Sequence, residues 1–382
     1  MRVYLDHNAT SPVRDEVVES MIRVLRGVHG NPSSAHEEGR AARAAVDRAR
    51  ESVASLIGVQ SEDVLFTAGA TEANNTLLLG LLGMRSDVAR HLVTSAAEHP
   101  SVEAPLEALE RQGWRVTRVE VDSDGLLDEA QFEAAIEPDT ALVSVLWANN
   151  ETGVLQPMGR IVTLARDRGI PIHADATQAV GKLPIDLREI PIDFLSLSAH
   201  KFNGPKGVGC LIARGDPAIE PILRGGPQER GRRGGTENVA AIVGLGVACE
   251  LAERELPARM RDYAALRDQL WEGIQAKIPS VQRNGSVDRV LPNTLNVEFA
   301  GAAGELLLQA LDVEGIAVSS GAACHSGSIE PSKVLIAMGR SPEAARGSLR
   351  FSVGHGNDAA QIDYALSLLP DRVERARQAV GA

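Results

Sequence analysis

Strand-like apolar runs and helix-like amphipathic segments alternate through most of this 382-residue chain. Strand-like runs lie at 64–66, 91–94, 114–121, 141–146, 170–174, 193–197 and 207–213. Helical periodicity lies between them, at 46–57, 72–82, 101–112, 128–136 and 157–168. Alternation at this spacing is typical of a parallel sheet that is covered by helices on both faces. We therefore predict an α/β fold with a largely parallel sheet of seven strands.

The pattern changes after Leu251. A long charged helix is predicted from Glu253 to about Ile278, beyond a helix from Val239 to Glu255. Strands are then predicted at 294–299, 316–319 and 348–352, with helices near 304–313 and from Ala359 onward. We expect two domains: a large α/β domain at 14–251, and a smaller α+β domain formed by residues 1–13 and 252–382.

Composition excludes several functional classes. The formal net charge is −12, so a nucleic-acid-binding surface is not expected. No apolar run approaches the roughly 18 residues of a membrane helix, and the polar residues Arg2, Asp6 and His7 do not fit a secretory signal. We expect a cytoplasmic protein that binds neither nucleic acid nor membrane.

Two residues at the ends of predicted strands indicate a site for a reactive cofactor. Asp175 follows the strand at 170–174, and Lys201 follows the strand at 193–197. The carboxyl ends of parallel strands form the ligand-binding edge of an open α/β sheet. Pyridoxal phosphate (PLP) needs a carboxylate for its ring nitrogen and an amine for its Schiff base.

Either residue alone is commonly a turn former or a solvated side chain. The active-site interpretation is favoured because other polar residues follow strand-like runs in the same way; these are Thr71, His99, Asn150, Gln178 and Ser198.

The three cysteines differ in their surroundings. Cys210 and Cys249 lie in apolar segments and are expected to be buried. Cys324 lies in the small, polar, glycine-rich stretch 319–328, where we expect an exposed loop and a reactive thiol. No Cys-x-x-Cys pair is present, and His173 or His325 has no set of further ligands at usable spacing, so we expect neither a disulfide nor a resident metal.

Several short motifs occur in a fixed order along the chain. They are Tyr4-Leu-Asp-His-Asn-Ala-Thr10, Phe66-Thr-Ala-Gly-Ala-Thr-Glu72, Glu98-His99, Trp147-Ala-Asn-Asn-Glu-Thr-Gly153, His173-Ala-Asp-Ala-Thr-Gln178, Ser198-Ala-His-Lys-Phe-Asn-Gly-Pro-Lys-Gly207, Gly225-Gly-Pro-Gln-Glu-Arg230, Gly234-Gly-Thr-Glu-Asn238 and the Cys324 loop. With these motifs the chain resembles the cysteine desulfurases of the aminotransferase class V family over nearly its whole length. The resemblance implies a PLP-dependent transferase of fold type I, of the subgroup with the long cysteine loop, and a homodimer.

The resemblance also implies roles for the matching residues. Lys201 would hold PLP and move the substrate α-proton, Asp175 would face the pyridine nitrogen, and His99 would stack on the ring and assist proton transfer. Gln178 and Asn150 would address the ring hydroxyl and the substrate. The phosphate would be bound by Ala70, Thr71, Ser198 and His200, with Thr236 reaching the phosphate of the other subunit.

Arg350 is an arginine inside the apolar strand 348–352. A buried guanidinium needs a partner, and its planar fork fits the α-carboxylate of an amino acid. A structural ion pair is the alternative.

The expected reaction converts L-cysteine to L-alanine and leaves a persulfide on Cys324. The resemblance implies that this sulfur supplies iron–sulfur cluster assembly and other sulfur transfer, through a scaffold or another acceptor protein, and that Cys324 can contact iron on a partner. Three features depart from the family pattern: Pro227 in place of a glycine, His325 after Cys324, and an end at Ala382 that is earlier than in some relatives. The alternatives are a selenocysteine lyase, a class V aminotransferase, or a non-catalytic scaffold that kept the fold.

Overall fold

The computed structural model describes residues 1–81, 90–320 and 330–381. Its main feature is a seven-stranded sheet in the order β2-β8-β7-β6-β5-β3-β4. The strands are β2 (Val64–Thr67), β8 (Gly209–Ala213), β7 (Phe194–Ser198), β6 (Ile172–Asp175), β5 (Thr140–Leu146), β3 (His91–Ser95) and β4 (Arg115–Val119). Only β8 runs antiparallel to its neighbours. The predicted α/β fold with a largely parallel sheet is confirmed.

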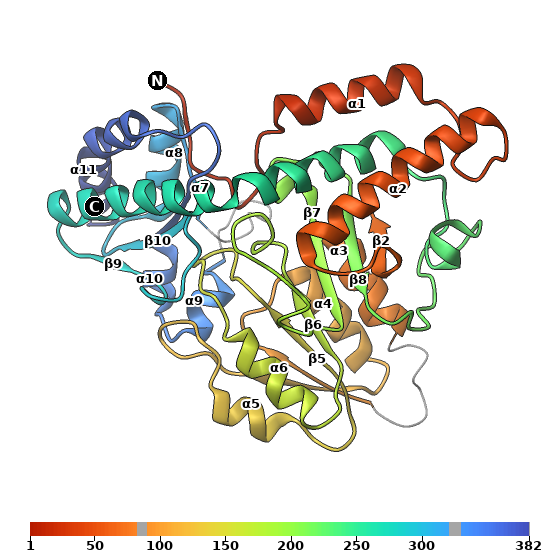
Figure 1. Ribbon diagram of the computed structural model, residues 1–382. Helices are drawn as coiled ribbons and strands as arrows, with labels where there is room; N and C mark the ends of the chain where they lie inside the picture. Colours follow the sequence, from red (N-terminus) through yellow and green to blue (C-terminus); the bar gives the residue numbers. More distant parts are fainter. Residues whose placement is uncertain (82–89, 321–329, 382) are drawn as a thin grey trace.

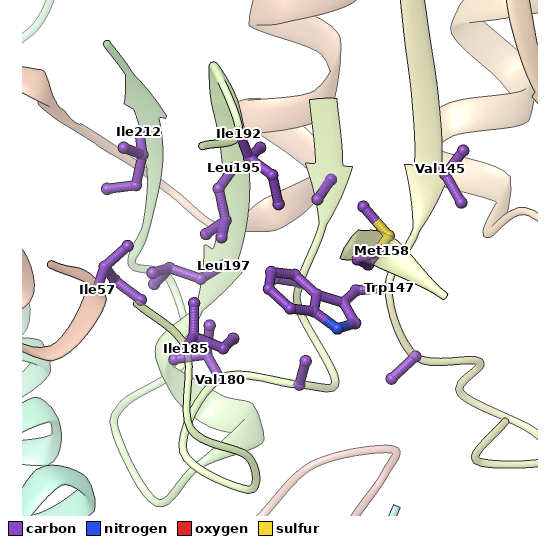
Figure 2. Close-up of a cluster of buried hydrophobic side chains, with 14 of the residues drawn as sticks. Ile57, Val145, Trp147, Met158, Val180, Ile185, Ile192, Leu195, Leu197 and Ile212 are labelled. Carbon is purple, nitrogen blue, oxygen red and sulfur yellow. The ribbon is translucent and has the colours of Figure 1, made fainter. Parts of the chain in front are cut away.

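Both faces of the sheet are buried, which explains why its strands are continuous apolar runs. Successive residues of one strand point to opposite faces. In β5, for example, Leu142 belongs to the core on one face and Val143 to the core on the other. Figure 2 shows part of the core on the Val143 face, where Leu195 and Leu197 of β7 lie near Ile212 of β8.

Helices cover the two faces unequally. The face that carries Val143 packs against α2 (Glu37–Ile57), α5 (Glu129–Ala135), α6 (Met158–Arg166) and the first half of α7 (Val239–Lys277). The opposite face packs against α3 (Ala70–Asn75), the π-helical turn Thr76–Leu81 and α4 (Pro100–Glu110). Helix α1 (Asp15–Gly27) packs along α7.

Helix α7 is continuous over 39 residues, where the sequence pattern indicated two helices. Pro257 lies inside it without ending it. Its first half is buried around Leu245 beside the large sheet, whereas Leu270 and Ile274 belong to a second core. The helix therefore runs from one core to the other (Figure 1), and the proposed domain boundary at Leu251 falls within it.

The second core is built on small sheets. The strands β12 (Ser348–Ser352), β10 (Thr294–Phe299) and β9 (Val281–Arg283) form an antiparallel sheet, and β1 (Val3–Tyr4) pairs with β11 (Ile316–Ala317). Helices α8 (Gly304–Val313) and α11 (Ala359–Gly381) complete this part, with the short helices α9 (Lys333–Ala337) and α10 (Pro342–Arg346) nearby. Val3 and Leu5 are buried in the second core, so the N-terminal segment packs with C-terminal elements.

None of the helices within the described ranges is long and apolar enough to span a membrane.

Candidate active site

A cavity of about 830 Å³ lies at the carboxyl edge of the large sheet. Nine of the residues predicted from the sequence line it: Ala70, Thr71, His99, Asn150, Asp175, Gln178, Ser198, His200 and Lys201. They converge because β2, β3, β5, β6 and β7 all point the same way, so that the segments after these strands meet at one edge.

Lys201 is held by the N-terminal segment. Its Nζ donates hydrogen bonds to the carbonyl oxygens of Asn8 at 2.8 Å and Ala9 at 2.9 Å. Burial, together with the nearby positive charge of Arg350, lowers the pKa of the Lys201 amine to about 8 against the opposing effects of Asp175 and Asp6. This amine therefore loses its proton more readily than an ordinary lysine, as a nucleophilic lysine requires.

Asp175 is 2% exposed and is oriented by two hydrogen bonds. Its Oδ2 accepts from Nδ2 of Asn74 at 2.9 Å, and its Oδ1 accepts from the backbone N–H of Thr177 at 3.0 Å. Both donors are neutral, so neither forms an ion pair with the carboxyl group, which can still pair with a positively charged group in the cavity.

His99 is the N-cap residue of α4. Its Nδ1 accepts a hydrogen bond from the backbone N–H of Ser101 at 3.1 Å, which places the proton of the neutral ring on Nε2. Burial lowers the pKa of His99 below the usual histidine value, so the neutral ring predominates near pH 7. The hydroxyl of Ser101 also accepts from Asn74 at 2.9 Å, which links His99 to the support of Asp175.

The turn after β2 offers an anion site. Gly69 has a φ of 154°, a backbone conformation that residues with a side chain rarely adopt. Helix α3 begins at the next residue, Ala70. The Thr67 hydroxyl donates to the Gly69 carbonyl at 2.9 Å and steadies the turn. Ser198 and His200 come to the same cavity from the end of β7. Backbone amides at the start of a helix, together with these side chains, suit a phosphate.

Arg350 lies in β12 behind the cavity and is 5% exposed. Its Nη2 forms an ion pair with Oδ1 of Asp6 at 2.6 Å, and its Nη1 donates to the carbonyl of Asn150 at 2.9 Å. Its Nε is buried without a partner among the described residues. The structural ion pair that was the alternative is therefore present, and the unpaired Nε leaves a donor for a further anion.

One predicted site residue lies in a neighbouring cavity, and another lies outside the residues that the structure describes. Thr236 lines a neighbouring cavity of about 190 Å³ that shares Ala68 and Gly207 with the main one. Cys324, with His325, lies outside the described residues. The other cysteines, Cys210 and Cys249, are fully buried as predicted, and burial raises the pKa of both thiols.

Sequence reasoning missed several supporting residues. Asn74 orients Asp175, Asn8 binds Lys201, and the buried Lys182 contacts Gln178. Glu98 accepts from Ser95 Oγ and from the backbone N–H of Leu146, and so links the ends of β3 and β5 beneath the cavity. Asn8 and Glu98 lay inside motifs that marked them, whereas nothing local distinguished Asn74 or Lys182 from ordinary helix and surface residues.

Comparison with known proteins identifies the class to which this fold and cavity belong. The family model for class-V aminotransferases matches residues 3–365, and the chain belongs to that family. A cysteine desulfurase of Cereibacter sphaeroides is 48% identical over 378 residues, which are 98% of this chain and 97% of that protein.

Solved structures of similar proteins have the same fold over nearly the whole chain. A NifS-like protein has a TM-score of 0.93 at 36% identity, with coverage of 98% of this chain and 100% of the other. A structure described as SspA in complex with cysteine has a TM-score of 0.82 at 38% identity, and the aligned part covers 92% of this chain and 98% of that chain.

Proposed function

We propose that the protein is a PLP-dependent cysteine desulfurase. The observation that carries the proposal is the convergence of Lys201 and Asp175 in one cavity, an amine of lowered pKa with a buried carboxylate that neutral donors orient. This is the donor set that PLP requires, and the turn at Ala70 and Thr71 offers amides for its phosphate. When bound, PLP supplies an electron sink for the carbon atom that loses its proton.

The chain's own residues supply the proton transfers and the orientation. Lys201, with a pKa of about 8, exchanges a proton near neutral pH and so suits general acid–base catalysis at the substrate α-carbon. The face of the neutral His99 ring is proposed to stack on the cofactor, and its N–H at Nε2 suits proton relay. Gln178 and Asn150 address the ring hydroxyl and the substrate, and Ser198, His200 and Thr236 complete the phosphate site, with Thr236 reaching the partner subunit.

Arg350 is proposed to bind the substrate carboxylate. Its guanidinium lies next to Asn150, which lines the cavity, and donates to the backbone carbonyl of Asn150 at 2.9 Å. A carboxylate that approaches it takes the place of Asp6 or uses the unpartnered Nε.

The sulfur step is proposed for Cys324. Its thiolate attacks the substrate sulfur, the bond between that sulfur and the substrate β-carbon breaks, and the β-carbon takes a proton. The products are L-alanine and a Cys324 persulfide, so no outside oxidant is needed. We propose that a protein acceptor, such as an iron–sulfur scaffold, then receives the sulfur, and that the enzyme is a cytoplasmic homodimer. The relatives named cysteine desulfurase and the relative solved with cysteine support this substrate.

The test is an assay of the purified, PLP-loaded protein with L-cysteine, in which alanine and sulfide are measured together. The expected result is alanine in a one-to-one ratio with sulfide in the presence of a thiol reductant. Turnover of selenocysteine without turnover of cysteine would favour the lyase, and production of pyruvate from alanine with a keto-acid acceptor would favour the aminotransferase. Because Lys206 also lines the cavity, the Lys201→Ala variant tests which lysine binds the cofactor. Loss of the cofactor absorption band in this variant would assign that role to Lys201.

A further inference from the structure

Lys182 is a lysine that none of the roles above uses. It is 4% exposed, and its Nζ donates to Oε1 of Gln178 at 2.6 Å and to Oδ1 of Asn8 at 3.1 Å. Burial, with the nearby charges of Lys201 and Arg350, lowers the pKa of Lys182 well below the usual lysine range. A lysine so placed is costly, because a charged or polar group loses water when it is buried.

Local backbone geometry brings Lys182 to Gln178. Two successive turns, closed by bonds from the N–H groups of Val180 and Leu183 to the carbonyls of Ala176 and Ala179, place residues four apart on the same side. Gly181 has a φ of 74°, and a Cβ there would lie 2.6 Å from Cβ of Phe202.

The Gln178 amide has one allowed orientation. Its Nε2 donates to the backbone carbonyl of Asn8 at 2.9 Å, and a carbonyl oxygen can only accept. Its Oε1 is therefore on the other side, where it accepts from Lys182. The second N–H of Nε2 has no partner among the described residues, and Gln178 lines the cavity into which it can donate.

Asn8 does not depend on Lys182 in the same way. Its Oδ1 also accepts from Nδ2 of Asn293 at 3.0 Å, and its Nδ2 donates to Oγ1 of Thr294 at 2.8 Å. The Asn8 carbonyl also accepts from Lys201. Loss of Lys182 would thus leave Asn8 oriented, whereas Oε1 of Gln178 would lose the one hydrogen bond that the described residues give it.

We propose that Lys182 is a positioning residue that anchors Oε1 of Gln178, so that Gln178 presents only an N–H donor to the cavity and favours the anionic form of the PLP ring hydroxyl. The inference rests on the proposed function, because it assigns the cavity to PLP. Without the anchor, only the hydrogen bond from Nε2 to the Asn8 carbonyl holds the amide, so that its N–H donor is directed less firmly at the ring hydroxyl and the hydroxyl keeps its proton more readily.

The experiment compares Lys182→Met with Lys277→Met, a control that removes an exposed lysine at the end of α7. The absorption spectrum of the PLP-loaded protein and the affinity for added PLP are measured. In Lys182→Met, the spectrum is expected to shift toward the band of the neutral hydroxyl, and PLP binding is expected to weaken roughly tenfold, as for an unsatisfied buried acceptor. The control should match the wild type.

A double-mutant cycle with Gln178→Leu separates positioning from general destabilisation. If Lys182 acts through Gln178, Lys182→Met changes the spectrum in the wild-type background and has no effect in the Gln178→Leu background. Equal spectral changes in both backgrounds, or an unchanged spectrum in Lys182→Met, would overturn the inference. A wild-type protein that binds no PLP would instead defeat the proposed function.

A second measurement needs no variant. In the cofactor-free wild type, nuclear magnetic resonance should find the side-chain N–H groups of Lys182 protected from hydrogen exchange, because its Nζ is buried and donates to Gln178 and Asn8. Rapid exchange would overturn the inference even if Lys182→Met does not fold.

Discussion

Asp6 and Arg350 form an ion pair of 2.6 Å that joins the N-terminal segment to β12, although 344 residues separate them in the sequence. The pair lies near Lys201, and both of its charges act on the pKa of that amine. The guanidinium proposed for substrate binding is thus held in place before any substrate arrives.

The first prediction concerns this guanidinium. Arg350→Lys keeps a positive charge but loses the planar fork, so the Michaelis constant for cysteine should rise roughly tenfold or more, as for a lost charge-assisted hydrogen bond. Affinity for PLP should stay unchanged. Arg346→Lys, in an exposed pair with Glu343, is the control. An unaltered Michaelis constant would mean that another cation binds the carboxylate.

The second prediction concerns the pH dependence of Lys201. In cofactor-free protein, labelling of Lys201 by an amine-reactive probe should rise with pH and level off above a midpoint of about 8, because only the neutral amine reacts. Arg350→Gln removes a charge that lowers this pKa, so its midpoint should move upward. Peptide mass spectrometry reads the labelling, with surface lysines as internal references. A midpoint near the ordinary lysine value of about 10.4 would contradict the prediction.

The third prediction concerns Glu98. Burial raises the pKa of this carboxyl from 4.5 to about 8, and its Oε2 has no partner among the described residues. Between these values the folded protein keeps a proton that the unfolded chain has lost. The free energy of unfolding should therefore fall as pH rises from about 5 to 8, by up to about 1.4 kcal/mol per pH unit from this group.

Glu98→Gln should flatten that slope, because the amide imitates the protonated acid and retains an oxygen for Ser95 and Leu146. Denaturant titrations at several pH values provide the measurement, and Glu107→Gln on the exposed side of α4 is the control. If the free energy of unfolding changes with pH equally in wild type and Glu98→Gln, the prediction that folding raises the pKa of Glu98 is wrong.

The fourth prediction concerns shared active sites. Thr236 lines a cavity beside the main one, and Arg233, in the same segment, pairs with Glu72 of α3 at 2.9 Å. If Thr236 serves the partner's phosphate, Thr236→Ala should bind PLP weakly. Mixing Thr236→Ala with Lys201→Ala should restore up to a quarter of wild-type activity, since half of the dimers would be mixed and each mixed dimer would hold one intact site. No recovery after verified subunit exchange, or full activity in a monomer, would contradict the shared site.

The fifth prediction concerns the cysteines. Cys324→Ser should retain PLP and lose alanine formation, because a hydroxyl cannot accept the sulfur. Cys210→Ala and Cys249→Ala should stay active, since both thiols are buried and their pKa values are raised. Mass spectrometry after cysteine treatment should find the added sulfur on the peptide that contains Cys324. Undiminished alanine formation by Cys324→Ser would refute the thiolate mechanism.

Much of the fold was predictable from local patterns. Apolar runs marked all seven strands of the large sheet within a few residues, because strands buried on both faces must be apolar throughout. The alternation with helices also predicted that the sheet is largely parallel, and β8 is the one antiparallel strand among the seven. Lys201 and Asp175 could be predicted to meet because parallel strands share a carboxyl edge.

The continuity of α7 was not predictable, because its composition changes from apolar to charged at the point where it leaves one core for the other. The sequence pattern reports burial rather than backbone conformation, so the change looked like a boundary. Pro257 lies inside the helix without ending it.

Local periodicity was enough to predict the strands along the chain, the edge of the sheet that carries the cavity, and Lys201 and Asp175 as residues of that cavity, since each depends on a pattern within a few residues. The three-dimensional arrangement was needed to see that Asn8 binds Lys201 across 193 residues, that Asp6 pairs with Arg350, and that Lys182 is buried against Gln178. The physical reason is that hydrogen bonds and pKa values depend on distances between atoms and on burial. Chain topology sets both, and no local stretch of sequence contains them.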